Sequence, residues 1–84
     1  MESRPAKESV SDQVALATRQ MEEFKRMKKE CVDKARELMA REDPEKGIYH
    51  NEEIFRLKQE SLRLEVEAEF CRKKINRLNL GYDQ

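Results

Sequence analysis

Glycine, proline and tryptophan are nearly absent from this sequence. Its 84 residues include two glycines, two prolines and no tryptophan, and only 37% of them are hydrophobic whereas 43% are charged. This apolar content cannot fill a rounded core. Long helices with one narrow apolar stripe and charged flanks suit it, because they need neither glycine nor proline in their interior. The composition therefore predicts an all-α protein, and its small apolar content predicts a partner.

Cysteine and histidine are also scarce. Cys31 and Cys71 lie far apart in the chain, and His50 is the single histidine. Two cysteines do not make a disulfide framework, and with one histidine they do not make a zinc site. The sequence has no glycine-rich phosphate loop and no nucleophile elbow, and two helices provide no concave site for a carboxylate pair. We therefore expect no catalytic residues, no metal, no cofactor and no enzymatic activity, and a solvated loop histidine at His50.

The chain has no net charge and no long apolar run. Its eighteen basic and eighteen acidic residues cancel, so no net field draws it to nucleic acid or to an anionic membrane. No charged-then-apolar leader begins the sequence, and no segment is apolar enough to span a bilayer. We expect an intracellular protein, cytoplasmic or nuclear, with no membrane insertion and no small-molecule substrate.

What the sequence does contain is a heptad pattern, and its first stretch predicts a long helix. Residues 1–8 are polar and aperiodic, so we expect a disordered tail there. Helix one is predicted over residues 9–42, with Ser9 or Ser11 as its N-cap. Small and apolar residues recur at two heptad positions along it: Val10, Ala17, Phe24, Cys31 and Leu38 at one, and Val14, Met21, Lys28 and Ala35 at the other.

A second helix follows a helix-breaking loop, which we place at residues 43–50. Pro44 disfavours helix, and the glycine three residues later tolerates a positive φ. Helix two is predicted over residues 51–80 with Asn51 as its N-cap, and residues 81–84 form a C-terminal tail. Its heptad positions are equally regular: Ile54, Ser61, Ala68 and Ile75 at one, and Leu57, Leu64, Cys71 and Leu78 at the other.

The two helices are predicted to fold back on each other as an antiparallel hairpin, because the midpoint of the pattern falls in the loop. The first heptad position of one helix then meets the second of the other, and large residues mostly face small ones. The residues of this predicted seam pair as Val14–Leu78, Ala17–Ile75, Met21–Cys71, Phe24–Ala68, Lys28–Leu64, Cys31–Ser61, Ala35–Leu57 and Leu38–Ile54.

Charges beside the seam favour this register. Three pairs of oppositely charged residues fall next to each other and no pair of like charges does. These pairs select the register more than they stabilise the hairpin. The main alternative is a parallel dimer of helix two, in which Glu60 would repel Glu65. The three predicted flanking pairs are Lys25–Glu65, Lys34–Glu60 and Arg41–Glu53.

Helix two carries a second apolar line, which we name the outer stripe. At 100° per residue it lies roughly 80–160° around from Ile54, whereas the seam occupies roughly 240–360°. One partner helix cannot cover both, so we expect the outer stripe to dock a second copy of the chain or another subunit. Alternatively, Phe55 and Leu62 fold over the loop and the others are singly exposed. The outer stripe comprises Phe55, Leu62, Val66, Phe70 and Leu80.

Two basic clusters, within residues 25–29 and 72–77, allow a different function. They offer contacts to phosphate, but acidic residues are interleaved with them. They also lack the interleaved aromatic residues of a protein that binds single-stranded nucleic acid. The leading hypothesis is therefore a non-enzymatic coiled-coil interaction module, a small structural or adaptor subunit of a multiprotein complex. The alternatives are a nucleic-acid-associated accessory protein and a self-sufficient homo-oligomer.

Overall fold

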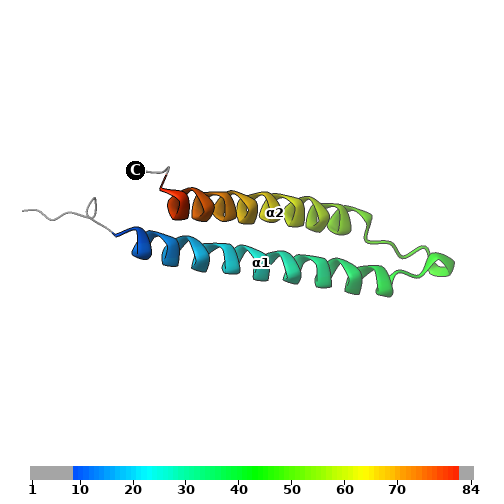
Figure 1. The fold of residues 1–84 in the computed structure, drawn as a ribbon. Helices are drawn as coiled ribbons and strands as arrows, with labels where there is room; N and C mark the ends of the chain where they lie inside the picture. The colour runs from blue at the N-terminus through cyan, green and yellow to red at the C-terminus, as the bar shows by residue number, and fades with distance from the viewer. Residues whose placement is uncertain (1–8, 82–84) are drawn as a thin grey trace, which may run out of the picture.

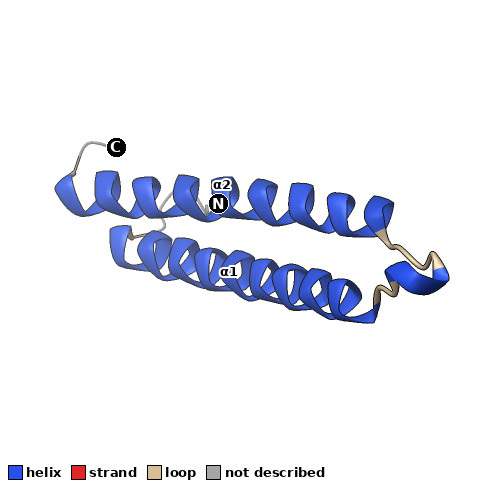
Figure 2. Ribbon diagram, turned by 90° about the vertical axis from the view of Figure 1, so that its right-hand side faces the viewer, coloured by secondary structure: helices blue, strands red, loops and turns tan. Residues whose placement is uncertain are grey.

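The computed structural model describes residues 9–81, and two long helices make up most of this range (Figure 1). Helix α1 spans Val10–Arg41 and helix α2 spans Asn51–Leu80. The helices run antiparallel and side by side, with the loop at one end and the end of α2 near the start of α1 (Figure 1, Figure 2). The predicted all-α helical hairpin is thus confirmed. The tails predicted at 1–8 and 82–84 lie outside the described residues.

Local signals set both ends of α1. Ser9 has an extended backbone, and its hydroxyl accepts the N–H of Asp12 at 3.0 Å, which caps the helix. The 32 residues that follow contain neither glycine nor proline, so the helix continues for about 48 Å at 1.5 Å per residue. It ends at Arg41 because Pro44 disfavours the helical conformation at Asp43, which is extended.

The loop is a closed turn. It contains the short 3₁₀ helix η2, Pro44–Lys46, and Asp43 and Ile48 exchange two backbone hydrogen bonds of 2.9 Å each. Gly47 has φ of 70°, a left-handed conformation that residues with a Cβ rarely adopt. The sequence predicted a break at this point but not the hydrogen bonds that close it.

The start of α2 differs from the prediction. His50 occupies the N-cap position without a capping hydrogen bond from its side chain, and Asn51 is the first helical residue. A carboxylate oxygen of Glu42 accepts the N–H of His50 at 3.0 Å. The prediction that Asn51 caps α2 is therefore wrong, because an acid at the end of α1 supplies the acceptor beside this helix start.

The contact between the helices is a thin apolar seam. Leu38, Ala35 and Ile54 form a buried cluster near the loop, with Leu57 packed against it. Every buried residue in the described range belongs to the predicted seam: Ala17, Ala35, Leu38, Ile54, Leu64, Ala68 and Leu78. The other seam residues are half-buried: Val14, Met21, Phe24, Lys28, Cys31, Leu57, Ser61, Cys71 and Ile75. In residues 9–81, no helix has the length and apolarity to cross a membrane.

Candidate docking surface

All five residues of the outer stripe are exposed on α2. Their exposed fractions are high for large apolar side chains, and no other part of the hairpin covers them. Because Phe55 is 64% exposed and Leu62 57% exposed, the loop does not cover the two residues nearest to it. The remaining exposed fractions are 50% for Val66, 59% for Phe70 and 66% for Leu80.

The outer stripe is exposed because α1 occupies the opposite side of α2. The helix turns about 100° per residue, so the stripe lies about 180° from the centre of the seam. Charged residues border it on both edges. One edge carries Lys58, Glu65 and Glu69, and the other carries Glu52, Arg56, Arg63, Glu67 and Lys74.

A few more apolar side chains are exposed elsewhere, and two of them lie in the loop. Ile48 is 42% exposed and Tyr49 is 54% exposed. The sequence analysis did not single out these two, although an isoleucine and a tyrosine in an otherwise polar breaker were a usable signal. On α1 the exposed apolar residues are scattered: Val10, Leu16 and Met39.

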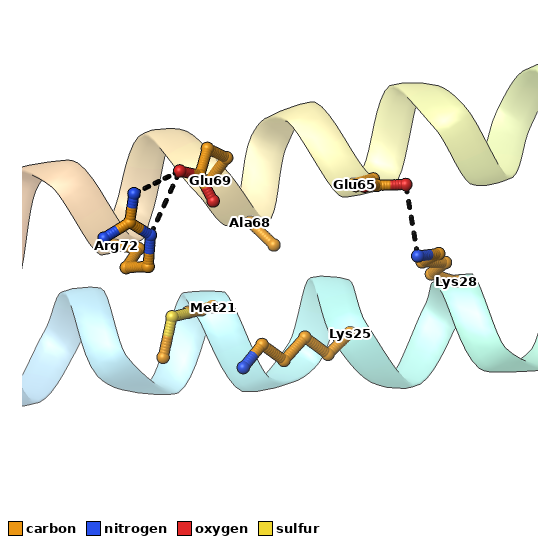
Figure 3. A pocket seen from close by; sticks show the side chains of 7 residues that line it. All are labelled: Met21, Lys25, Lys28, Glu65, Ala68, Glu69 and Arg72. Carbon is orange, nitrogen blue, oxygen red and sulfur yellow. Dashed lines mark hydrogen bonds and ion pairs between the residues drawn. The ribbon is translucent and has the colours of Figure 1, made fainter.

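Lys28 makes the single ion pair between the two helices within residues 9–81. Its ammonium nitrogen lies 3.2 Å from a carboxylate oxygen of Glu65, and its side chain is 39% exposed (Figure 3). The prediction placed Lys25 beside Glu65, and Lys25 does line the same groove, but Glu65 forms its ion pair with Lys28 (Figure 3). A lysine in the seam can keep its stem between the helices while its ammonium leaves at the edge, where it reaches Glu65 first.

The other two predicted flanking pairs do not form in the described part of the chain. Glu60 pairs with Arg63 on its own helix at 2.5 Å, although it lines a groove together with Lys34. Glu53 lies 3.9 Å from Nδ1 of His50 rather than beside Arg41. Ion pairs within one turn of a helix form here in place of ion pairs across the seam. Residues three or four positions apart are already neighbours on the helix surface, so fewer side-chain torsions must be fixed to bring them together.

Some members of each basic cluster pair with acids on the same helix. Arg26 contacts Glu23 at 2.5 Å and also contacts Glu30, while Lys29 lies 2.8 Å from Asp33. In the second cluster Arg72 pairs with Glu69 (Figure 3).

These pairs act on the acids as well as on the bases. The hydrogen bond from Arg26 holds the pKa of Glu23 below its usual value, and that from Lys29 does the same for Asp33. Arg72 likewise lowers the pKa of Glu69. The ionised acids offset the charge of Arg26, Lys29 and Arg72.

The residues considered for metal or redox chemistry lie apart from one another. Cys31 and Cys71 are free thiols, each half-buried at the seam. Within residues 9–81, no three His, Cys, Asp or Glu side chains gather as metal ligands would. In this range, neither Cys31 nor Cys71 forms a site with His50.

No family model, curated protein or solved structure matches the chain. The function of the outer stripe is therefore argued from its own geometry.

Proposed function

We propose that this chain is a non-enzymatic coiled-coil interaction module, a small structural or adaptor subunit that docks through the outer stripe of α2. The observation that carries the proposal is the exposure of that stripe. Five large apolar side chains lie along one face of one helix, and each is at least 50% exposed. The charged Lys73 and Arg77 lie on this face between Phe70 and Leu80, and from Phe55 to Phe70 it carries no charge. An exposed apolar face bordered by charges is typical of a protein-binding surface.

Burial of this face would contribute favourable free energy to binding. Complete burial of one such side chain stabilises by about 1.5–3 kcal/mol, so partial burial of five yields several kcal/mol. The side chains already stand at fixed spacing on a long helix, which reduces the ordering cost of association. An apolar helix laid along the stripe from Phe55 to Phe70 would meet residues separated by four or seven positions.

The shape of the surface favours a protein over a small molecule. The outer stripe is a convex ridge, whereas a small ligand needs a concave site that encloses most of its surface. The grooves of the hairpin lie elsewhere, beside the seam, and charged residues such as Lys25, Glu69 and Arg72 line them (Figure 3). This supports a helix or a flat protein face as the partner.

A double substitution on the outer stripe tests the proposal. Leu62→Gln with Val66→Gln removes apolar surface from the stripe and keeps acceptable helix propensity. We expect this variant to keep its helical circular dichroism and to lose association, measured as mass by light scattering alone and in the presence of cell extract. The matched control is Leu57→Gln with Leu64→Gln, which places polar groups in the seam and should lower helicity as well. Unchanged association in the Leu62/Val66 variant would refute docking through the stripe.

A further inference from the structure

From Phe55 to Phe70 the face of α2 that carries the outer stripe has nearly the same spacing in both directions. Within this part Gln59 and Val66 lie inside the two phenylalanines and Leu62 is near the middle, while Leu80 lies beyond it and takes no part in the symmetry. We propose that the stripe docks onto the same stripe of a second copy of this chain, antiparallel, with the twofold axis beside Leu62. This inference rests on the proposed function and names its partner.

The apolar contacts of this arrangement follow from the rise of the helix. With 1.5 Å per residue, Phe55 of one copy lies level with Phe70 of the other, and Leu62 lies within about 1.5 Å of the level of Leu62. Gln59 lies level with Val66, so every layer holds at least one large apolar side chain. Twofold symmetry repeats each contact, as in most homodimers.

The charges along one edge of the stripe complement themselves in this register. In an antiparallel pair each edge meets the same edge of the other copy. Lys58 of one copy then lies between Glu65 and Glu69 of the other, within about 3 Å of each along the helix axis. Within residues 9–81, Lys58 forms no ion pair, whereas Glu65 pairs with Lys28 and Glu69 with Arg72 of their own chain, so Lys58 of the second copy would add a further cation to each acid.

The charges along the other edge also complement themselves. Arg56 lies within about 3 Å of the level of Glu67 of the second copy, and Lys74 lies within about 1.5 Å of the level of Glu52. The like-charged contact in this arrangement is between the two Arg63 side chains at the axis. Each Arg63 already lies 2.5 Å from Glu60 and 3.9 Å from Glu67 of its own helix, which neutralises it.

A parallel pair of α2 helices is less compatible with these charges. The two edges would then face each other, placing Lys58 against Arg63 and Arg56, and Glu67 against the acids of the first edge. Arg63 with Glu65 and Lys74 with Glu69 would be the favourable pairs. The antiparallel arrangement therefore has the better electrostatic complementarity, which is what selects one register among several apolar ones.

The position of the stripe also determines the shape of the dimer. Because the stripe points away from α1, two copies would place four helices in a row with both α2 helices in the centre. The outward side of α1, which carries Arg19 and Glu22, would take no part in the contact. Substitutions there provide a control that reverses two charges away from the contact.

Reciprocal charge reversal in the full chain tests this pairing. The acidic variant carries Lys58→Glu and Lys74→Glu, and the basic variant carries Glu52→Lys and Glu69→Lys. Each variant alone would face like charges at both positions, so we expect its dimer dissociation constant to rise at least ~10-fold. In an equimolar mixture the contacts of position 58 with position 69 and of position 74 with position 52 become opposite charges again, while Lys58→Glu still faces Glu65 of the other copy, so we expect a dissociation constant at least ~3-fold below that of either variant alone.

Sedimentation equilibrium of the native chain, the two variants and their mixture gives the readout, with circular dichroism on the same samples. The native chain should show twice the 10.0 kDa of one copy at micromolar concentration. The control variant, Arg19→Glu with Glu22→Lys, should retain the native mass.

Three results would overturn the inference. They are a native chain that stays single up to several hundred micromolar, charge variants that dimerise as the native chain does, and a mixture that fails to recover. None of these refutes docking of a different protein, since that function depends on the separate effect of Leu62→Gln with Val66→Gln on capture. Conversely, a dimer that survives Leu62→Gln with Val66→Gln refutes the pairing of the two stripes, whereas unchanged capture of a different protein by that variant refutes docking through the stripe.

Discussion

Leu62 and Leu64 are two residues apart on α2 and occupy opposite environments. Leu64 is 1% exposed in the seam, whereas Leu62 is 57% exposed on the outer stripe. Truncating a fully buried leucine removes its burial and leaves a cavity, so Leu64→Ala should lower the free energy of unfolding by about 2–4 kcal/mol. Leu62→Ala should change it by less than about 0.5 kcal/mol in dilute samples. Urea denaturation followed by circular dichroism measures both, and equal losses would mean that seam and stripe form one core.

Lys28 is the one charged residue among the predicted seam positions. Replacing it with leucine exchanges a half-buried ammonium and an exposed ion pair with Glu65 for apolar contact with its neighbours in the seam. We expect Lys28→Leu to raise the melting temperature and to weaken control over oligomeric state, since a lysine in a seam opposes other registers. Lys29→Leu is the control, because Lys29 is 77% exposed and its ion pair with Asp33 lies within one helix. A lower melting temperature with unchanged mass would contradict this role for Lys28.

The sequence suggests Asn51 as the N-cap of α2, but Glu42 supplies the acceptor at the start of this helix. Asn51 caps nothing, so Asn51→Ala should cost less than about 0.5 kcal/mol, given the better helix propensity of alanine. Glu42→Ala removes the acceptor of the His50 N–H and should cost about 1–2 kcal/mol. Thermal melts of the two variants test this, because a true Asn51 cap would make Asn51→Ala the more destabilising substitution. His50→Ala keeps the backbone N–H and serves as the control.

At the scale of the elements, ion pairs within single turns support both helices. Opposite charges lower the pKa of four carboxyls, chiefly through a hydrogen bond in each case. A lowered pKa in the folded state gives stability that is present above the ordinary pKa, about 4, and is lost as pH falls through the lowered value. Helicity and melting temperature should therefore fall on acidification from pH 5 to pH 3, and added salt should reduce the difference. Circular dichroism across this range tests it, and an unchanged melt at pH 3 would contradict it. The pairs are Glu23–Arg26, Asp33–Lys29, Glu60–Arg63 and Glu69–Arg72.

The helices were predictable because their limits depend on local signals. A serine cap, Pro44 and Gly81 act within a few residues, so α1 and α2 begin and end within one residue of the predicted ranges. The buried residues were predictable from the heptad spacing, which is likewise a local property of the sequence. The contact of Glu42 with His50 was not predictable, since it depends on the path of a closed turn. The choice of Lys28 over Lys25 as partner of Glu65 likewise depends on how long side chains leave the seam.

At the scale of the molecule, the buried core is small for a chain of this length. One line of contact between two helices contains the whole buried set, and two of its members are Ala17 and Ala35. Chains of this size bury a modest share of their surface and commonly need a staple or an oligomer. Within the described residues no disulfide supplies that staple, since Cys31 and Cys71 are free. Association through the outer stripe would add apolar burial where the fold leaves it exposed.

If folding and association are coupled in this way, stability must depend on protein concentration. Anything that binds the folded chain but not the unfolded chain raises the free energy of unfolding by mass action, by about 1.4 kcal/mol for each tenfold excess over the dissociation constant. We therefore expect the melting temperature of the native chain to rise when its concentration is increased from ~1 to ~100 µM. The Leu62→Gln, Val66→Gln variant should melt at one temperature throughout this range, because its surface for the second copy is gone. Leu64→Ala should melt lower at every concentration and still show the rise, because its seam is weakened while its outer stripe is intact.

Differential scanning fluorimetry and circular dichroism over the same dilution series measure this. A native melting temperature that stays constant with concentration would mean that the hairpin folds without a second copy, and the stripe would then act on a different protein.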